Sequence, residues 1–324
     1  MAKKKIKRND EEVDIFLWDA YDEFIAIKEV RNLSASTLRN YDISFNYFCD
    51  FYNFDRSTPL NEIKSSHIYK WMNTLKLQGI KPISINTYVS NMRSFFYWCM
   101  AEERQYMPHF KIELMKYQEE TLKMFSDEEI EALLEKPKRS DSFVDWRTWT
   151  IVNWVLATGN RASTIINVKM CDLNFTKREI TLAHTKNKKA QVIPMSSELD
   201  KVLKQYIKMW RNEADINGYL FPNIGDEQMT YRTLQTSFQR YCEKREVSRC
   251  NIHGLRHNFA KGFIMSNGNV FILQKILGHQ TLDMTRRYIK IFGEDLKEEY
   301  DSHSPLDTIK KSQRREQKVK RNLD

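Results

Sequence analysis

The chain lacks the features that mark membrane, secreted and nucleotide-driven proteins. Its 324 residues contain no apolar run near the ~20 residues that a membrane-spanning helix needs. The first eight residues are mostly basic and no apolar stretch follows them, so we expect no secretory signal. Only nine glycines occur, and none forms a phosphate-cradling loop of the nucleotide-binding kinds. An ATP- or NAD-driven enzyme is therefore not expected.

Cysteine is scarce as well, and its pattern argues against disulfides and metal clusters. The five cysteines are odd in number and never form Cys-x-x-Cys, which is typical of reduced, packed side chains in a cytosolic protein. His253 and His257 stand four residues apart, but no His-Glu-x-x-His motif or cysteine-rich partner accompanies them. We expect no metal site and no cofactor.

What the chain has in excess is positive charge. Its 52 Lys and Arg residues exceed its 43 Asp and Glu residues, which gives a formal net charge of +9. An anionic polymer is therefore a plausible ligand. The length predicts two domains, and the hydrophobic content of 41% is enough to build cores.

The first hundred residues have a helical pattern. Apolar and aromatic residues recur at helical spacing, and Ser36, Ser65 and Ser84 stand where helices would begin. This predicts four amphipathic helices in a small bundle with the aromatic side chains in its core. The opposite faces carry basic residues that either meet phosphates or are simply solvated; they include Arg39, Lys81 and Arg93.

A second helical region follows a break in the pattern. Periodicity lapses between Met107 and Phe125, as expected of an interdomain linker. Ser126 then opens a capping box, and residues 143–158 continue as a helix towards Arg161.

A β-hairpin is predicted beyond that helix. Residues 179–183 and 190–194 carry the only clear β pattern, and the polar loop between them places Lys186 at the tip. Helical patterns resume from about Ser197 to the end of the chain.

Five residues of the second region suit chemistry on a phosphodiester. A guanidinium group is planar, permanently charged and matched to two phosphate oxygens at once. A phenol titrates near pKa ~10, so it attacks readily only where cations stabilise its anion. In chain order the five residues are Arg161, His253, Arg256, His279 and Tyr288.

The order and spacing of these residues resemble the tyrosine recombinase family, which includes the phage integrases. The family signature is Arg, Lys, His-x-x-Arg, His or Trp, and Tyr. Arg161 follows Ala-Thr-Gly-Asn, His279 follows Leu-Gly, and Tyr288 occupies the place where the family keeps its nucleophile. The lysine that the family adds to such a set would be Lys186, and choosing it over Lys188 as the hairpin lysine rests on the resemblance. The chain departs from the pattern at Thr164, where the family usually carries an acidic residue.

The resemblance implies a mainly α fold with a DNA-clasping domain and a catalytic domain. We expect an N-terminal helical, SAM-like core-binding bundle and a mostly helical catalytic domain with a small antiparallel β-hairpin or sheet, the DNA breaking-rejoining enzyme fold. The expected divisions are a basic extension 1–10, the core-binding domain 11–106, a linker 107–124, the catalytic domain 125–300 and a basic tail 301–324.

The resemblance also implies a metal-independent strand transfer. Tyr288 would attack the phosphorus and form a 3′-phosphotyrosine, while Arg161 and Arg256 hold the phosphate. Lys186 would protonate the leaving 5′ oxygen. His253 would accept or relay the tyrosine proton and His279 would bond to the phosphate, with His257 as support. Further DNA contacts are expected at Arg39, Lys81, Arg93, Lys188, Arg286 and Arg287.

The implied partner is double-stranded DNA with a specific recombination site. We expect a homotetramer in the synaptic complex, an accessory DNA-bending or directionality factor, no membrane, and a place in the bacterial cytoplasm at the nucleoid. Integration or excision of a mobile element is the favoured role. Two alternatives stay open at this point: type IB topoisomerase-like strand relaxation, and a DNA-binding protein of the same fold without catalysis.

Overall fold

The computed structural model describes residues 15–117, 124–182 and 190–279, together with residues 281, 285 and 288. The chain divides into two compact units, Met1–Glu120 and Thr121–Asp324. Each unit has an apolar core of its own. No helix in the described ranges is both long and apolar enough to cross a membrane.

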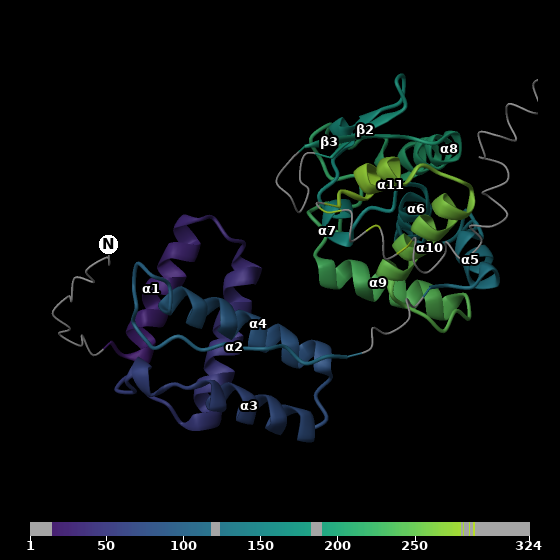
Figure 1. Ribbon diagram of the computed structural model, residues 1–324. Coiled ribbons are helices and arrows are strands. Elements are labelled where there is room, and N and C mark those ends of the chain that lie inside the picture. The colour runs from purple at the N-terminus through teal and green to yellow at the C-terminus, as the bar shows by residue number, and fades with distance from the viewer. Residues whose placement is uncertain are drawn as a thin grey trace, which may run out of the picture. The chain divides into compact units, whose positions relative to one another are not determined.

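The first unit is the predicted bundle of four helices. Helix α4 contacts each of the other three (Figure 1). The helices are α1 (Leu17–Val30), α2 (Ala35–Tyr52), α3 (Ser65–Leu77) and α4 (Pro82–Cys99), with a short 3-10 turn, η1 (Leu60–Glu62), between α2 and α3.

Two of these helices begin slightly earlier than predicted. The side chain of Ser34, not Ser36, caps α2 by accepting a hydrogen bond from the backbone N–H of Thr37. Helix α4 begins at Pro82 rather than after Ser84, because proline needs no partner for its nitrogen in the first turn of a helix.

Aromatic side chains form the core of the first unit, as predicted. Phe24, Phe45 and Phe95 are almost fully buried and meet edge to face, with ring centroids 5.5 and 5.8 Å apart for the two pairs that involve Phe95. Tyr21 stacks on Phe45 at 3.7 Å. Such rings bury large apolar areas, so they account for much of the stability of this small bundle.

Part of the segment expected as a linker belongs to this core. Met107 and Ile112 are 6% and 2% exposed. The side-chain amide of Asn86 donates to the carbonyl of Met115 and accepts from its N–H, both at 2.9 Å. Apolar burial and this two-way amide contact therefore fix residues 107–115 on the first unit.

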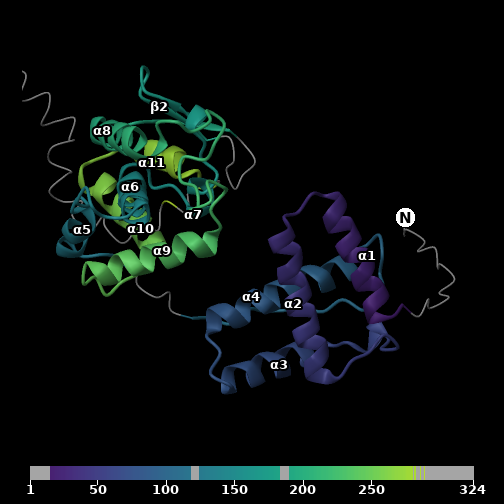
Figure 2. The ribbon, with the colours of Figure 1, turned by 180° about the vertical axis from the view of Figure 1, so that it is seen from behind.

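The second unit is built around α6 (Phe143–Thr158). Figures 1 and 2 show α6 among the surrounding helices, and α5, α8, α9 and α10 all contact it. The remaining elements are α5 (Asp127–Leu134), α7 (Ala162–Ile165), η2 (Met170–Asp172), β1 (Leu173–Asn174), β2 (Glu179–Leu182), β3 (Gln191–Pro194), α8 (Ser197–Tyr206), a π-helical turn η3 (Ile207–Arg211), α9 (Tyr231–Lys244), α10 (Ile252–Met265) and α11 (Val270–Leu277).

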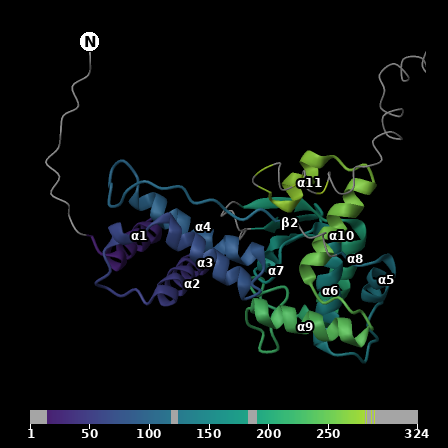
Figure 3. The same cartoon turned by 60° about the horizontal axis from the view of Figure 1, so that its bottom comes forward.

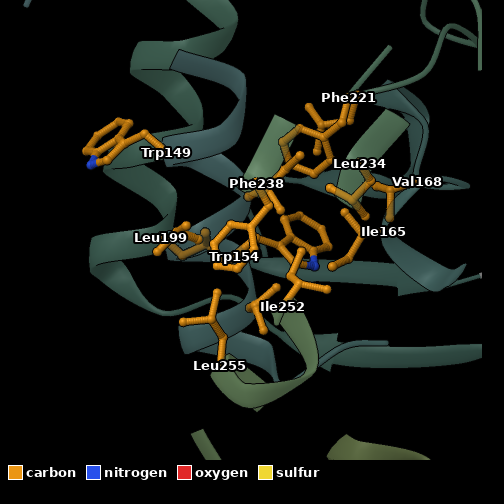
Figure 4. Close-up of a cluster of buried hydrophobic side chains, with 14 of the residues drawn as sticks. Trp149, Trp154, Ile165, Val168, Leu199, Phe221, Leu234, Phe238, Ile252 and Leu255 are labelled. Carbon is orange, nitrogen blue, oxygen red and sulfur yellow. The ribbon is translucent and has the colours of Figure 1, made fainter. Parts of the chain in front are cut away.

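Helix α6 is buried on nearly all sides, which places it at the centre of this unit. Trp146 and Trp154 are almost fully buried. Figure 4 shows Trp154 among Phe238 of α9, Leu255 of α10 and Phe221. Figure 3 shows α10 running beside α6, and the two helices are in contact. The core thus fixes the start of α10 against the end of α6.

The predicted hairpin is present, with one further strand beside it. Strands β2 and β3 pair antiparallel with Ile180 opposite Ile193. Ile180 and Leu182 are buried while Glu179 and Thr181 are exposed. Strand β1 adds two residues to the other edge of β2. It was missed because two residues are too few to show an alternating pattern. The mainly α fold with a small antiparallel sheet is confirmed.

Candidate active site

The end of α6 sets the position of Arg161. The helix ends at Gly159, whose φ of +61° favours glycine. A Cβ there would lie 2.4 Å from the ring of Phe259 and 2.7 Å from the side chain of Leu277. Glycine therefore lets the chain turn sharply while α10 and α11 approach closely, and Arg161 follows at the start of α7.

Two arginines converge on the last carbonyls of α11. Arg256 is 2% exposed, and its Nη1 donates to Gly159 O at 2.6 Å while its Nη2 donates to Leu277 O at 3.1 Å. Arg161 Nη1 donates to Leu277 O at 3.3 Å and lies 3.5 Å from Gly278 O. The negative end of the helix dipole thus offsets the repulsion between two nearby cations.

Both arginines keep their charge at neutral pH. Burial lowers the pKa of Arg161. Burial, followed by the charge of Arg161, lowers the pKa of Arg256 to about 10. Two permanent positive charges therefore stand side by side in a partly dehydrated site, where an anion is held more strongly than in water.

His279 is fixed between Arg256 and a buried threonine. Its Nε2 lies 2.8 Å from Arg256 Nη2, and its Nδ1 lies 2.8 Å from Thr285 Oγ1. A guanidinium can only donate, so Nε2 accepts and Nδ1 carries the proton. Burial, then the charges of Arg256 and Arg161, lower the pKa of His279 to about 4. His279 is therefore neutral and orients Arg256 in this arrangement.

The hydroxyl of Tyr288 meets His257. Tyr288 is 5% exposed, and its Oη lies 2.8 Å from His257 Nδ1. Its ring stacks on that of His279, with centroids 6.2 Å apart and planes 3° from parallel. The phenol is thus held by one imidazole and aligned by another.

His253 lies beside Arg161 and next to His257. It lines a cavity together with Arg161, and its ring meets the ring of His257 edge to face at 4.7 Å. Loss of water around its ring, followed by the charges of Arg256 and Arg161, lowers the pKa of His253, although part of the residue stays exposed.

The structure therefore adds two residues to the predicted set. His257 was expected only as support, and Thr285 was not among the predicted residues. A sequence signal for His257 did exist: residues 253, 256 and 257 fall at i, i+3 and i+4 of α10 and so share one helix face. No pattern pointed to Thr285, because its contact depends on where the segment after α11 packs.

Two small cavities flank Arg161. The first, of about 190 Å³, is lined by residues that include Arg161, Arg256, Thr164 and Gln191. The second, also of about 190 Å³, is lined by residues that include Arg161, His253 and Tyr231. An anion in the first cavity would reach both guanidinium groups.

Thr164 occupies the position of the usual acidic residue. It is 7% exposed and lines the first cavity. In the part of the chain that the structure describes, its side chain makes no hydrogen bond to Arg161. The carbonyls of Leu277 and Gly278 accept from Arg161 instead. Backbone acceptors thus supply the orientation that a carboxylate would otherwise give.

Strand β3 is tied to the same helix end. The side-chain amide of Gln191 donates to Lys275 O and, at 3.3 Å, to Ile276 O. The hairpin is therefore anchored beside the two arginines. Four predicted site residues, Lys186, Lys188, Arg286 and Arg287, lie outside the described residues.

The predicted DNA contacts of the first unit lie on α2 and α4. Arg39 is exposed on α2, Lys81 is the exposed N-cap of α4, and Arg93 is partly buried on α4. Their contact with DNA stays a prediction.

Comparison with known families identifies the chain. The family model described as "Phage integrase family" matches residues 123–294, more than half of the chain. The model described as "Phage integrase, N-terminal SAM-like domain" matches residues 19–103. The chain belongs to the phage integrase family. These are the tyrosine recombinases, enzymes that cleave and rejoin DNA strands, so the resemblance and the expected enzyme class are confirmed.

Individual relatives agree with this assignment to the phage integrase family. A tyrosine recombinase XerC of Staphylococcus aureus (strain USA300 / TCH1516) is 25% identical over 285 residues, which cover 86% of this chain and 94% of that protein. The Tn1549 transposon integrase in complex with a circular intermediate DNA has a TM-score of 0.67 and 20% identity, covering 85% of this chain and 95% of the other.

A second solved structure shows the same fold. A lambda integrase tetramer bound to a Holliday junction has a TM-score of 0.66 and 16% identity, covering 85% of this chain and 78% of the other.

Proposed function

We propose that this phage integrase family member is a site-specific recombinase in which Tyr288 attacks DNA and His257 accepts the phenolic proton. The observation that carries the proposal is the 2.8 Å contact between Tyr288 Oη and His257 Nδ1 in a buried site with two arginines. A phenol becomes a strong nucleophile when a base takes its proton and cations stabilise the developing charge.

The two arginines would hold the scissile phosphate. Arg161 uses Nη1 for the α11 carbonyls, so its Nη2 and Nε groups remain to donate to phosphate oxygens. Arg256 adds a second charge, kept in place by Gly159 O, Leu277 O and His279. Fixed donors aimed at the phosphate stabilise the extra charge of the transition state.

The transfer step exchanges one phosphoester bond for another, so it needs no external energy source. The Tyr288 O–H bond breaks and its proton moves to His257 Nδ1, while the phenolic oxygen bonds to phosphorus. The bond from phosphorus to the 5′ oxygen breaks, and Lys186 donates a proton to that oxygen. A 3′-phosphotyrosine results. Attack by another 5′-hydroxyl reverses the step and joins a new pair of strands.

Double-stranded DNA with a specific site is the proposed substrate, and a homotetramer the proposed synaptic form. The excess of basic residues supports the DNA partner. The fold shared with an integrase tetramer on a Holliday junction supports the assembly. An accessory bending or directionality factor belongs to the same proposal.

Integration or excision of a mobile element is the proposed biological role. The fold shared with a transposon integrase supports it, and the alternative role is chromosome-dimer resolution. Sequencing the DNA on both sides of the gene decides between them. Terminal repeats that bound a discrete element are expected, and a gene without such repeats contradicts the role.

The reaction is tested with nicked suicide duplexes made from that flanking DNA. A nick beside the scissile phosphate lets the cut fragment diffuse away and traps the covalent complex. We expect an adduct that resists denaturation, forms with chelator present and depends on the site sequence. Absence of any adduct contradicts catalysis, and equal trapping on every sequence contradicts site-specific recombination.

A further inference from the structure

A basic cavity lies in the second unit apart from the site of Tyr288. Its volume is about 520 Å³, within the range of pockets that bind small ligands. It lies between the first half of α6, one face of α9 and residues 223–225. Helix α9 lies beside α6 in Figures 1 and 3, and the two helices are in contact. None of the residues assigned to catalysis lines this cavity.

One face of α9 is polar and turned towards this cavity. Thr233, Thr236, Ser237 and Arg240 line it, and they fall at i, i+3, i+4 and i+7 of the helix. The apolar residues of α9, such as Phe238, are buried in the core. The cavity is therefore bounded by hydroxyl groups and a guanidinium, while the opposite face of α9 packs in the core.

Arg147 brings a buried charge from α6. It is 1% exposed, and its Nη1 donates to Pro222 O at 2.5 Å while its Nη2 donates to Ser237 Oγ at 3.1 Å. Its Nε has no hydrogen-bond partner in the described structure. No carboxylate within the described ranges forms an ion pair with it. A buried charge without a counter-ion is unfavourable, so an anion in the cavity would stabilise this arrangement.

Two further arginines line the cavity, and they too lack an acidic partner among the described residues. Arg232 and Arg240 are exposed, and neither forms an ion pair with any residue that the structure describes. No acidic residue lines the cavity in this part of the chain; Glu227 binds the lining residue Asn223 from outside it. Three permanent positive charges thus line one cavity, and none of its described lining residues is acidic.

We infer that this cavity binds a phosphate group. Guanidinium groups match phosphate oxygens in pairs, and the threonine and serine hydroxyls supply further donors. The phosphate comes either from a DNA backbone or from a free phosphorylated molecule. Thr230 and Arg232 line this cavity while Tyr231, between them, lines the one beside Arg161 and His253, so the two cavities lie close to each other at the start of α9. The inference goes beyond the proposed function and needs no cleavage.

Binding of a free phosphorylated molecule is tested by titrating pyrophosphate into the full chain and measuring the heat of binding. Tyr288→Phe is the background, so that cleavage plays no part. Arg232→Gln and Arg240→Gln remove exposed charges and keep the core, so they should fold; Arg147→Met tests the buried charge. Each is expected to weaken pyrophosphate binding about tenfold, the effect of losing one charge-assisted hydrogen bond. Arg139→Gln, an exposed arginine outside the cavity, is the matched control and is expected to bind as the parent does.

Binding of a DNA backbone phosphate is tested by measuring how duplex binding by the same variants depends on salt concentration. The plot of log K against log salt falls with a negative slope, and each lost phosphate contact makes that slope shallower by about 0.9. A shallower slope for Arg232→Gln and Arg240→Gln, but not for Arg139→Gln, supports a backbone phosphate. Weaker pyrophosphate binding supports a free ligand. Equal pyrophosphate binding and equal slopes in all these proteins overturn the inference, whereas loss of catalysis alone would leave it unaffected.

Discussion

His257 Nδ1 lies 2.8 Å from Tyr288 Oη, across 31 positions of the chain. We therefore propose that the second histidine of His-x-x-Arg-His, rather than the first, takes the proton of the nucleophile. His253 instead lines the cavity beside Arg161. The two histidines are therefore expected to differ when each is replaced.

Replacing His257 should slow DNA cleavage and change its dependence on pH. His257→Gln keeps a hydrogen-bonding side chain but removes the base, so we expect a loss of about 10²–10⁴ in the cleavage rate. Because a phenol ionises near pKa ~10, alkaline pH should restore part of that rate. Single-turnover cleavage of a nicked duplex measures both. His253→Gln is the matched control, and an alkaline rescue seen only in that protein would contradict the assignment.

Acid should destabilise the second unit through His279. Its folded pKa is about 4, below the ~6.5 of an unfolded histidine. The unfolded chain therefore binds this proton first, and stability falls as pH drops from about 6.5 towards about 4. Since His279 is partly exposed, we expect a loss of only about 1–2 kcal/mol between about pH 7.5 and about pH 5.

Urea unfolding at the two pH values measures this loss. His279→Gln lacks the titrating group, so its free energy of unfolding should change less over the same interval. An equal change in both proteins would show that other groups cause the acid sensitivity.

Two glycines give opposite predictions for the same substitution. Gly159→Ala places a Cβ 2.4 Å from Phe259 at a φ of +61°, so we expect it to destabilise by about 2–4 kcal/mol. Gly262 lies within α10 with nothing within 4 Å of an added Cβ, so Gly262→Ala should stabilise by about 0.5–1 kcal/mol. Thermal unfolding of both proteins checks the pair, and equal effects would rule out this account of the end of α6.

Thr164 should contribute little to the orientation of Arg161. Its side chain makes no hydrogen bond to Arg161 in the described structure, and backbone carbonyls accept from the guanidinium instead. Thr164→Val should therefore change the cleavage rate by no more than about twofold. A loss as large as that caused by Arg161→Ala would mean that the hydroxyl holds the arginine in the DNA-bound state.

The sequence was informative wherever a pattern is local. Helical spacing predicted the four helices of the first unit, and Ser126 and Glu129 form the predicted capping box. The hairpin followed from two short β patterns. Phe24, Phe45 and Phe95 are core residues because aromatic side chains at helical spacing have few other stable places.

Contacts between distant segments could not be predicted in the same way. Residues 107–115 lack a periodic pattern, yet Asn86 and burial fix them on the first unit. The carbonyls that orient Arg161 belong to the backbone, which no side-chain pattern reveals. Thr285 meets His279, and Tyr288 packs with Ala260 of α10, through tertiary contacts that no local pattern predicts.

The identity of the residue joined to DNA is the most direct test of this account. The adduct trapped on a nicked duplex with chelator present can be digested and its peptide sequenced by mass spectrometry. We predict that the nucleotide is attached to Tyr288 and that Tyr288→Phe forms no adduct. Attachment to another residue, such as Tyr300, or an adduct that persists in Tyr288→Phe, would contradict it.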